Sequence, residues 1–289
     1  MTIKMFSRIN LMSGVACVAA LLPSPAMADH SWNGYHWAGI SADAPLRAPV
    51  GNNVSSDWTV SLQLAVGEWR VSDVLDVPLA AGQTHPRKCD PVDGTMQICS
   101  YSYGLRGWLG IATVWTSGDH ILAATTKLND SYFGAGSTYN TQAWRDLVTC
   151  QEVGHDFGLA HQDENFYNQN LGTCMDYTDD PEGTLHAYNA GLSNVAPNMH
   201  DYDELDIIYD GHSEGTSGGG GGAGGGKGGG KGGGGKPYAD VGSGESPADW
   251  GQATHYNADG KPDYFRKPLL NGRNMITHVF WVPGKARKE

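Results

Sequence analysis

The chain has 289 residues, with 31 Asp and Glu against 19 Lys and Arg and a formal net charge of −12. This length allows one or two domains with a sizeable core. Residues 29–215 hold 25 acidic and 7 basic residues, a net of −18, whereas residues 216–289 hold 6 and 10, a net of +4. The acidic body excludes nucleic acid as the partner, because phosphate binding needs a basic face.

The first 28 residues are predicted to be an export signal. Lys4 and Arg8 give a positive start, residues 11–22 are mostly apolar, and Ala-Met-Ala at 26–28 fits a cleavage site. The alternative is an uncleaved anchor, but the apolar run is shorter than the about 20 residues that span a bilayer. We therefore expect a mature chain beginning at Asp29, secreted or periplasmic, with no stable membrane association.

The body, residues 29–215, is predicted to be an α+β domain. Residues 55–69 carry apolar side chains at helical spacing after a serine cap. Strands rich in β-branched and aromatic residues are expected at 74–79, 96–101, 108–115 and 120–128. A helix follows at 141–155, capped by Asn140 or Thr141. After a long irregular segment, a last helix is expected at 198–209, with Asn198 and Asp201 as a capping pair.

Composition separates this body from the end of the chain. Residues 216–236 are nearly all glycine and are predicted to be a flexible tether. Residues 237–289 are expected to form a small C-terminal module of unknown role, in which 275–282 read as a strand. A hairpin docked on the body or on a substrate is the expected form.

Four of the five cysteines remain after signal removal: Cys89, Cys99, Cys150 and Cys174. An even number in an exported chain favours disulfides. Three pairings are open. Cys89 and Cys99 flank a turn-rich stretch that suits a local bridge, which would leave Cys150 with Cys174. The alternative for Cys150 is a thiolate metal ligand.

One short segment, residues 151–161, carries the pattern of a metal site. Gln151 and His155 are four residues apart, so they project from one face of a helix, with Glu152 close by. Gly158 can adopt a positive φ and end the helix, so that His161 can return toward the same metal. Zinc with three protein ligands keeps a position open for water, whose proton Glu152 could take.

This segment resembles the metzincin signature HExxHxxGxxH at every defining position except the first, where Gln151 replaces histidine. Cys-Met-Asp-Tyr at 174–177 resembles the Met-turn beneath the metal, and Tyr177 matches a tyrosine near the zinc of astacins and serralysins. The chain is also similar to bacterial and fungal secreted proteins that share CQEVGH, HQDE and CMDYT and are generally treated as metzincins. The resemblance covers roughly residues 108–209.

The resemblance implies a metzincin-like fold: a mixed sheet, an active-site helix, and an irregular C-terminal subdomain with the Met-turn and the final helix. It also implies a secreted zinc metalloendopeptidase that cuts protein or peptide substrates with a zinc-bound water. Zinc would be held by Gln151, His155 and His161, with Glu152 as general base and Tyr177 stabilising the oxyanion. The strand at 120–128 is expected to align an extended peptide at a sheet edge.

Several alternatives stay open at this point. Gln151 could bind zinc through its amide oxygen, hold a water that binds in its place, or leave a site of poor affinity. The two histidines could instead be polar residues satisfied at a helix end. The rival function is a weak or inactive metzincin homologue that acts as a binding protein.

An acidic stretch after the motif is a candidate for calcium, although such runs are more often solvated loops and no EF-hand spacing is present. Its members are Asp163, Glu164, Asp176, Asp179, Asp180 and Glu182.

Overall fold

The computed structural model describes residues 29–38, 45–210 and 244–284. The predicted signal and the glycine-rich tether lie outside these residues. Within them, one nine-stranded sheet of mixed parallel and antiparallel pairs is flanked by a few helices, which fits an α+β class. None of the described helices is long and apolar enough to cross a membrane.

The helices of the described residues follow the periodicity of the sequence, with one short addition near the C-terminus. They are α1 (Thr59–Trp69), α2 (Gln142–Asp156), α3 (Met199–Asp210) and α4 (Pro247–Trp250). Thr141 caps α2, since its side chain accepts from the Trp144 N–H at 3.2 Å. The predicted capping pair at α3 is confirmed, because the Asn198 N–H donates to Asp201 Oδ2 at 2.7 Å.

The strands form a single path in the order β3-β2-β4-β6-β5-β9-β8-β7, with β1 on β6. Their bounds are β1 (His36–Trp37), β2 (Val50–Asn53), β3 (Leu79–Ala81), β4 (Met96–Tyr101), β5 (Trp108–Ser117), β6 (His120–Asn129), β7 (Gln252–Tyr256), β8 (Pro262–Pro268) and β9 (Arg273–Trp281). The strands expected at 96–101, 108–115, 120–128 and 275–282 are confirmed.

The strand predicted at 74–79 is wrong for nearly all of its length. Residues 74–78 make one isolated bridge, Leu46 to Leu75, and β3 begins only at Leu79. Val74, Leu75 and Val77 are nevertheless buried. Their apolar character reflects core packing of an irregular segment, which β-propensity does not distinguish from a strand.

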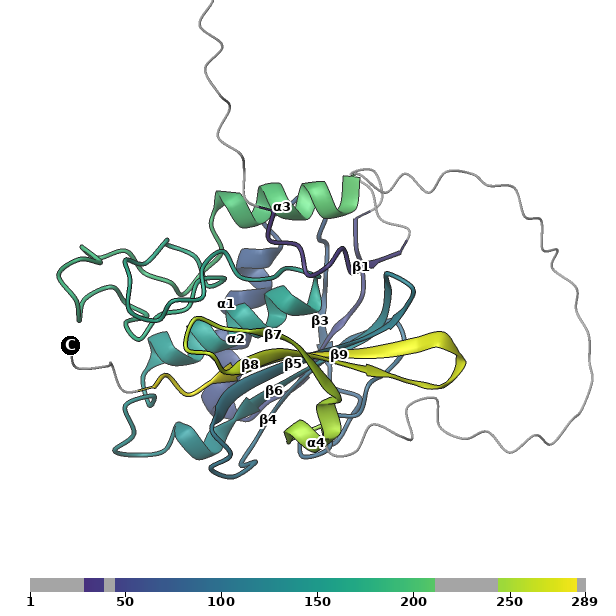
Figure 1. Ribbon diagram of the computed structural model, residues 1–289, viewed down its shortest axis with the longest axis horizontal. Coiled ribbons are helices and arrows are strands. Elements are labelled where there is room, and N and C mark those ends of the chain that lie inside the picture. The colour runs from purple at the N-terminus through teal and green to yellow at the C-terminus, as the bar shows by residue number, and fades with distance from the viewer. Residues whose placement is uncertain (1–28, 39–44, 211–243, 285–289) are drawn as a thin grey trace, which may run out of the picture.

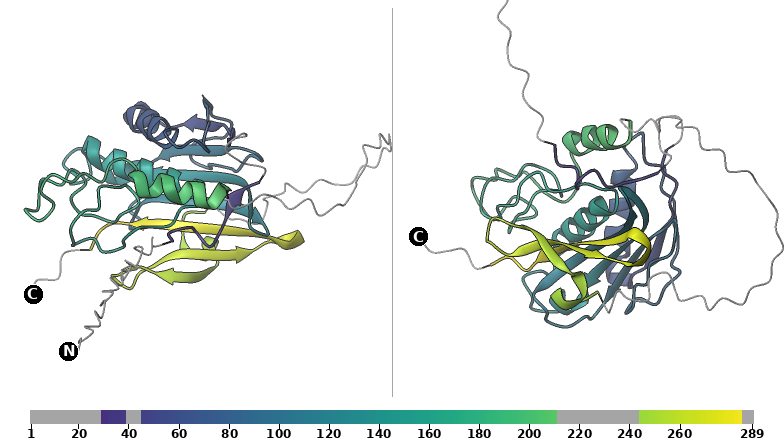
Figure 2. Two further views of the ribbon diagram at one scale, coloured as in Figure 1. Left: turned by 90° about the horizontal axis from the view of Figure 1, so that it is seen from above. Right: turned by 45° about the vertical axis from the view of Figure 1, so that its right-hand side comes forward.

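The C-terminal segment forms the expected hairpin docked on the body, as strands β8 and β9, but this hairpin continues the body's sheet instead of forming a separate module. Strand β9 pairs antiparallel with β5 from Trp108↔Trp281 to Ser117↔Arg273, and β8 and β7 continue the same sheet. Figures 1 and 2 show these strands in yellow, beside β5 and next to α2. Residues 244–284 are therefore part of the body's sheet.

Strand β6 cannot be the substrate-aligning edge expected from the sequence. It pairs with β4 on one side and with β5 on the other, so its backbone groups are already used. Without the C-terminal segment, the outer edge of β5, next to α2, would be an open edge of the sheet.

Both expected disulfides, Cys89–Cys99 and Cys150–Cys174, are formed. The second joins α2 to the segment that precedes Met175, across a sequence separation of 24 residues. Disulfides of this kind are typical of proteins in oxidising compartments.

We expect replacement of Cys150 and Cys174 by alanine to lower the free energy of unfolding by about 3 kcal/mol, because the closed loop restricts the unfolded chain. Chemical denaturation of the double variant measures it. The Cys89→Ala/Cys99→Ala pair, with a separation of 10, should lose somewhat less. An unchanged denaturation midpoint in the Cys150→Ala/Cys174→Ala variant would show that the Cys150–Cys174 bridge does not stabilise the body.

Candidate metal centre

Helix α2 presents Gln151, Glu152 and His155 to the interior, where all three are 0% exposed. The helix packs on the sheet near β5, and the fit is close at Gly110. A Cβ added there would lie 2.8 Å from Glu152 Cγ and from Val148 Cγ1. The missing side chain of Gly110 therefore lets the helix bring Glu152 against the sheet.

Gly158 ends this helix as the sequence predicts. Its φ is +94°, and an added Cβ would collide with the Tyr35 carbonyl oxygen. The same turn is fixed from the N-terminal segment, since Trp32 N–H donates to the Gly158 carbonyl at 2.6 Å. The chain can thus double back and return His161 toward His155.

We expect Gly158→Ala to destabilise the protein by about 1–3 kcal/mol, because alanine would be strained at this φ and would also push Tyr35 away. Thermal or chemical denaturation measures the loss. Gly136 also has a positive φ, +81°, but open space around it. Gly136→Ala therefore isolates the backbone cost, and equal losses in the two variants would refute the role given to the Tyr35 contact.

His155 and His161 converge. Their Nε2 atoms lie 3.1 Å apart, while His155 Nδ1 contacts the Leu159 carbonyl at 2.8 Å and His161 Nδ1 contacts the Tyr264 hydroxyl at 3.0 Å. A hydrogen-bond partner at Nδ1 orients the ring and leaves Nε2 to bind metal. The two predicted histidine ligands are therefore brought together in a geometry that suits one ion.

A third histidine, His278 of β9, completes the group. One ligand atom from each of His155, His161 and His278 lies within 4.8 Å of the others, and all three residues are buried. His278 also contacts Glu152, with Nδ1 3.0 Å from Oε2, and Tyr177, with Nε2 2.9 Å from the hydroxyl. Sequence reasoning missed it. The available signal was a single polar residue between Ile276 and Phe280 on the core-facing side of a predicted strand.

Gln151, the predicted first ligand, lies buried one turn before His155. Its Nε2 donates to the Cys174 carbonyl at 2.7 Å, whereas its Oε1 has no hydrogen-bond partner among the described residues. A buried amide oxygen without a donor is costly and calls for a ligand or an ion. A metal ion is one such partner. The three converging imidazoles are donors that suit zinc, whereas no contact joins Gln151 Oε1 to them in the described residues.

Burial dominates the electrostatics of these residues. Loss of hydration lowers the pKa of His155 and His161 well below the usual value, and it lowers that of His278 to about 3. The same effect raises the pKa of Glu152 well above that of an exposed carboxyl. The imidazoles are therefore neutral, the form that binds metal.

The predicted Met-turn lies directly against α2. A Cβ on Gly154 would lie 2.6 Å from Met175 Sδ, and Met175 is 0% exposed. Tyr177, two residues later, stacks on Phe166 and places its hydroxyl on His278 and 3.4 Å from Asp263 Oδ2. Residues 174–177 thus pack against α2 and contact the histidine cluster through Tyr177, while their identity as a Met-turn stays a prediction.

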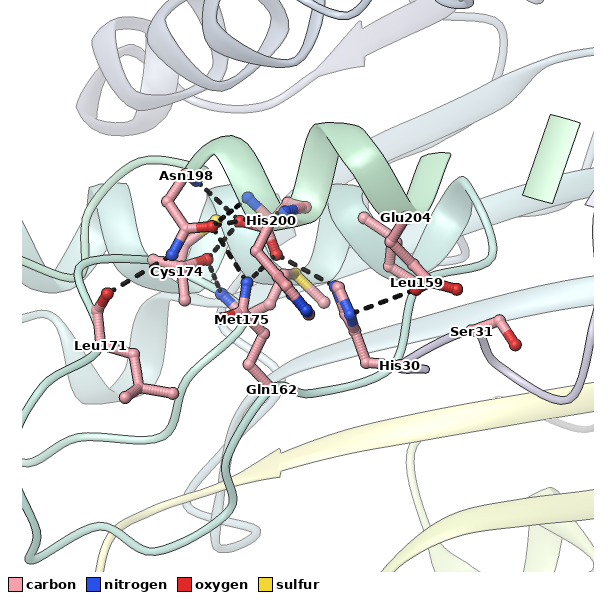
Figure 3. Close-up of polar contacts among 12 residues, drawn as sticks. His30, Ser31, Leu159, Gln162, Leu171, Cys174, Met175, Asn198, His200 and Glu204 are labelled. Carbon is pink, nitrogen blue, oxygen red and sulfur yellow. Dashed lines mark hydrogen bonds and ion pairs between the residues drawn. The ribbon is translucent and has the colours of Figure 1, made fainter. Parts of the chain in front are cut away.

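A polar network holds this turn in place (Figure 3). Asp201 of α3 accepts hydrogen bonds from the Thr173 hydroxyl, from Gln162 Nε2 at 2.8 Å and from Asn198 N. His30, from the N-terminal segment, lies 3.2 Å from the same carboxylate. These buried contacts join α3, the N-terminal segment and the Met-turn into one support for the site.

The predicted acidic stretch is mostly engaged by its own loop. Asp180 accepts from the N–H groups of Thr184, Leu185 and His186, and Asp176 accepts from Leu171 N–H. Of its members, Glu164 belongs to a second possible metal group, with His161 and Asp263. Calcium binding stays a prediction.

No protein-family model matches the chain, and the search of curated proteins finds no match.

Proposed function

We propose that this protein is a zinc-dependent endopeptidase that acts outside the cytoplasm on protein or peptide substrates, with a metzincin-like active site. The observation that carries the proposal is the convergence of His155, His161 and His278, with the Glu152 carboxylate hydrogen-bonded to the same cluster. Neutral imidazoles suit zinc, and the orphaned oxygen of Gln151 is a further donor nearby on α2.

His155 and His161 would hold the ion from α2 and the segment that follows it, with His278 or Gln151 as the third protein ligand. When bound there, zinc would supply Lewis acidity, which polarises a carbonyl and makes water more acidic. Glu152 is not required as a ligand. Burial favours its neutral form, and the positive charge of a bound ion would favour the carboxylate, which would then accept the proton of the attacking water and pass it to the leaving amine.

Tyr177 would donate a hydrogen bond to the developing oxyanion. Its hydroxyl contacts His278 Nε2, whereas the Glu152 carboxylate contacts the other ring nitrogen, Nδ1. Burial raises the pKa of Tyr177 well above its usual value, so the hydroxyl keeps its proton and remains a donor.

A second candidate is a non-catalytic metal-binding protein. The observation that favours it is the nearly complete burial of the cluster: His155 and His278 are 0% exposed and His161 is 8% exposed. Zinc sites that only stabilise a fold are closed, whereas catalytic sites keep a position open.

Digestion of unfolded casein by the purified chain separates the two. We expect hydrolysis with zinc, its loss with a chelator, and its return when zinc is added back. Stoichiometric zinc with no hydrolysis under any condition would contradict the peptidase and support the metal-binding alternative.

A further inference from the structure

The C-terminal strand β9 lies where an extended peptide would have to lie to reach the histidine cluster. It runs antiparallel along the outer edge of β5, with Ala112 directly opposite His278 and Gly110 opposite Phe280. Extended peptides bind proteins in this way, by adding a strand to a sheet edge. The segment therefore uses the backbone groups that such a substrate needs.

The side chains of β9 also close the site. Ile276, His278 and Phe280 point toward the core. Phe280 stacks against Phe166 and Tyr177, at centroid distances of 6.1 Å and 5.3 Å. His278 takes up both groups that would act on substrate, Glu152 and Tyr177. With β9 in place, the site is sealed.

The topology allows the segment to leave as a unit. Elements α4, β7, β8 and β9 are consecutive in sequence and make up one end of the sheet. Strands β3, β2, β4, β6 and β5 pair with one another without them. Only one ladder, β5 with β9, joins the two groups of strands.

The interface near the site includes buried polar contacts beside the apolar ones of Ile276 and Phe280. Besides the contacts of His278, Tyr264 of β8 bonds His161 at 3.0 Å and His255 of β7 lies 3.5 Å from Glu164. These groups gain hydration when the strands part, so separation costs less there than across an apolar core.

From these observations we infer that residues 244–284 are an internal occupant of the substrate edge: β9 closes the metal centre and must separate from β5 before a peptide can bind. His278 would then be a ligand of the closed form only, and Gln151 would be the third protein ligand of the open form. The inference rests on the proposed peptidase function. It assigns the closed form to a latent state and the outer edge of β5 to an extended peptide substrate.

A reversible cross-link tests it in the full-length chain. Thr113 of β5 and Thr277 of β9 face one another in register, with their hydroxyl oxygens 3.3 Å apart, on the sheet face opposite His278. The double variant Thr113→Cys/Thr277→Cys should form a disulfide that locks β9 without touching the site. Peptide mapping establishes which cysteines are paired. The controls are the parent and the Thr277→Cys variant under the same mild reductant, which show whether the reductant breaks the native disulfides.

Two readouts follow. The first readout is amide hydrogen exchange in β5 and β9, measured without added metal. In the parent and in the reduced variant, we expect these amides to exchange through local separation of the two strands and not through global unfolding. Oxidation should slow this exchange to the level of β4 and β6. The second is zinc-dependent casein hydrolysis, which oxidation should lower by about tenfold or more, because the rate follows the open fraction.

The outcomes separate the two proposals. If the amide hydrogens of β9 exchange only through global unfolding, the proposal that β9 separates from β5 is wrong. The parent protein is enough for this measurement, even if the double variant misfolds. Equal rates of hydrolysis by the oxidised and reduced forms would also contradict the proposal that β9 occupies the substrate edge, but would support the peptidase function. Local opening of β9 without hydrolysis in any form would support the occupant and refute the peptidase.

Discussion

Replacing Glu152 with glutamine should lower zinc-dependent hydrolysis by about 10²–10⁴-fold, the usual loss on removal of a general base. Glutamine has nearly the same shape and can still accept a hydrogen bond from His278 Nδ1, which lies 3.0 Å from the carboxylate. It cannot take a proton from water. Zinc content and the denaturation midpoint should therefore stay close to those of the parent.

The measurement is kcat/KM on an unfolded protein substrate, with bound zinc quantified in the same samples. Glu182→Gln is the matched control, because Glu182 is exposed in the loop after the Met-turn. Retention of more than a tenth of the parental kcat/KM by Glu152→Gln would remove Glu152 from the role of base, whatever its effect on stability.

Zinc affinity should fall most when a converging histidine is removed. We expect His155→Ala and His161→Ala to weaken binding by more than about 100-fold, since even outer contacts of a metal site contribute 10–100-fold. His278→Ala should also weaken it, because its ligand atom lies within 4.8 Å of the other two. Chelator competition measures all of these, with exposed His85→Ala as the control.

The unusual glutamine gives a separate prediction. Gln151→Ala should lose zinc more readily than the parent if the orphaned Oε1 is a ligand, and Gln151→His should retain zinc more tightly, because imidazole is the better donor. Activity need not follow affinity, since an additional imidazole at position 151 would donate more charge to the ion and make its water less acidic. Equal affinities for Gln151→Ala and the parent would leave His278 as the third ligand.

The histidine substitutions test which residues bind the metal, whereas the Thr113→Cys/Thr277→Cys disulfide tests whether β9 moves. A loss of affinity in His278→Ala would show that β9 contributes to the metal centre, but not that β9 moves. Only the comparison of β5 and β9 exchange with that of the inner strands addresses movement. The nearly complete burial of the histidines is consistent with a latent peptidase as well as with a closed metal-binding site.

The sequence by itself determined the local elements and the near part of the site. Helices α1, α2 and α3 and strands β4, β5 and β6 follow from apolar spacing, caps and β-branched runs, which are properties of neighbouring residues. Both disulfides were also predicted. The approach of His155 to His161 needed only a helix, a glycine with positive φ and a short return of the chain.

Tertiary structure decided what depends on pairing between distant segments. Strand β9 joins β5 across more than a hundred residues, and periodicity carries no information on which edge a strand will choose. For this reason the sequence does not specify that the C-terminal hairpin pairs with β5, that β6 lies inside the sheet, or that His278 belongs to the site. Backbone hydrogen bonding between β5 and β9 places that residue beside Glu152 and the two histidines of the motif, which no local pattern specifies.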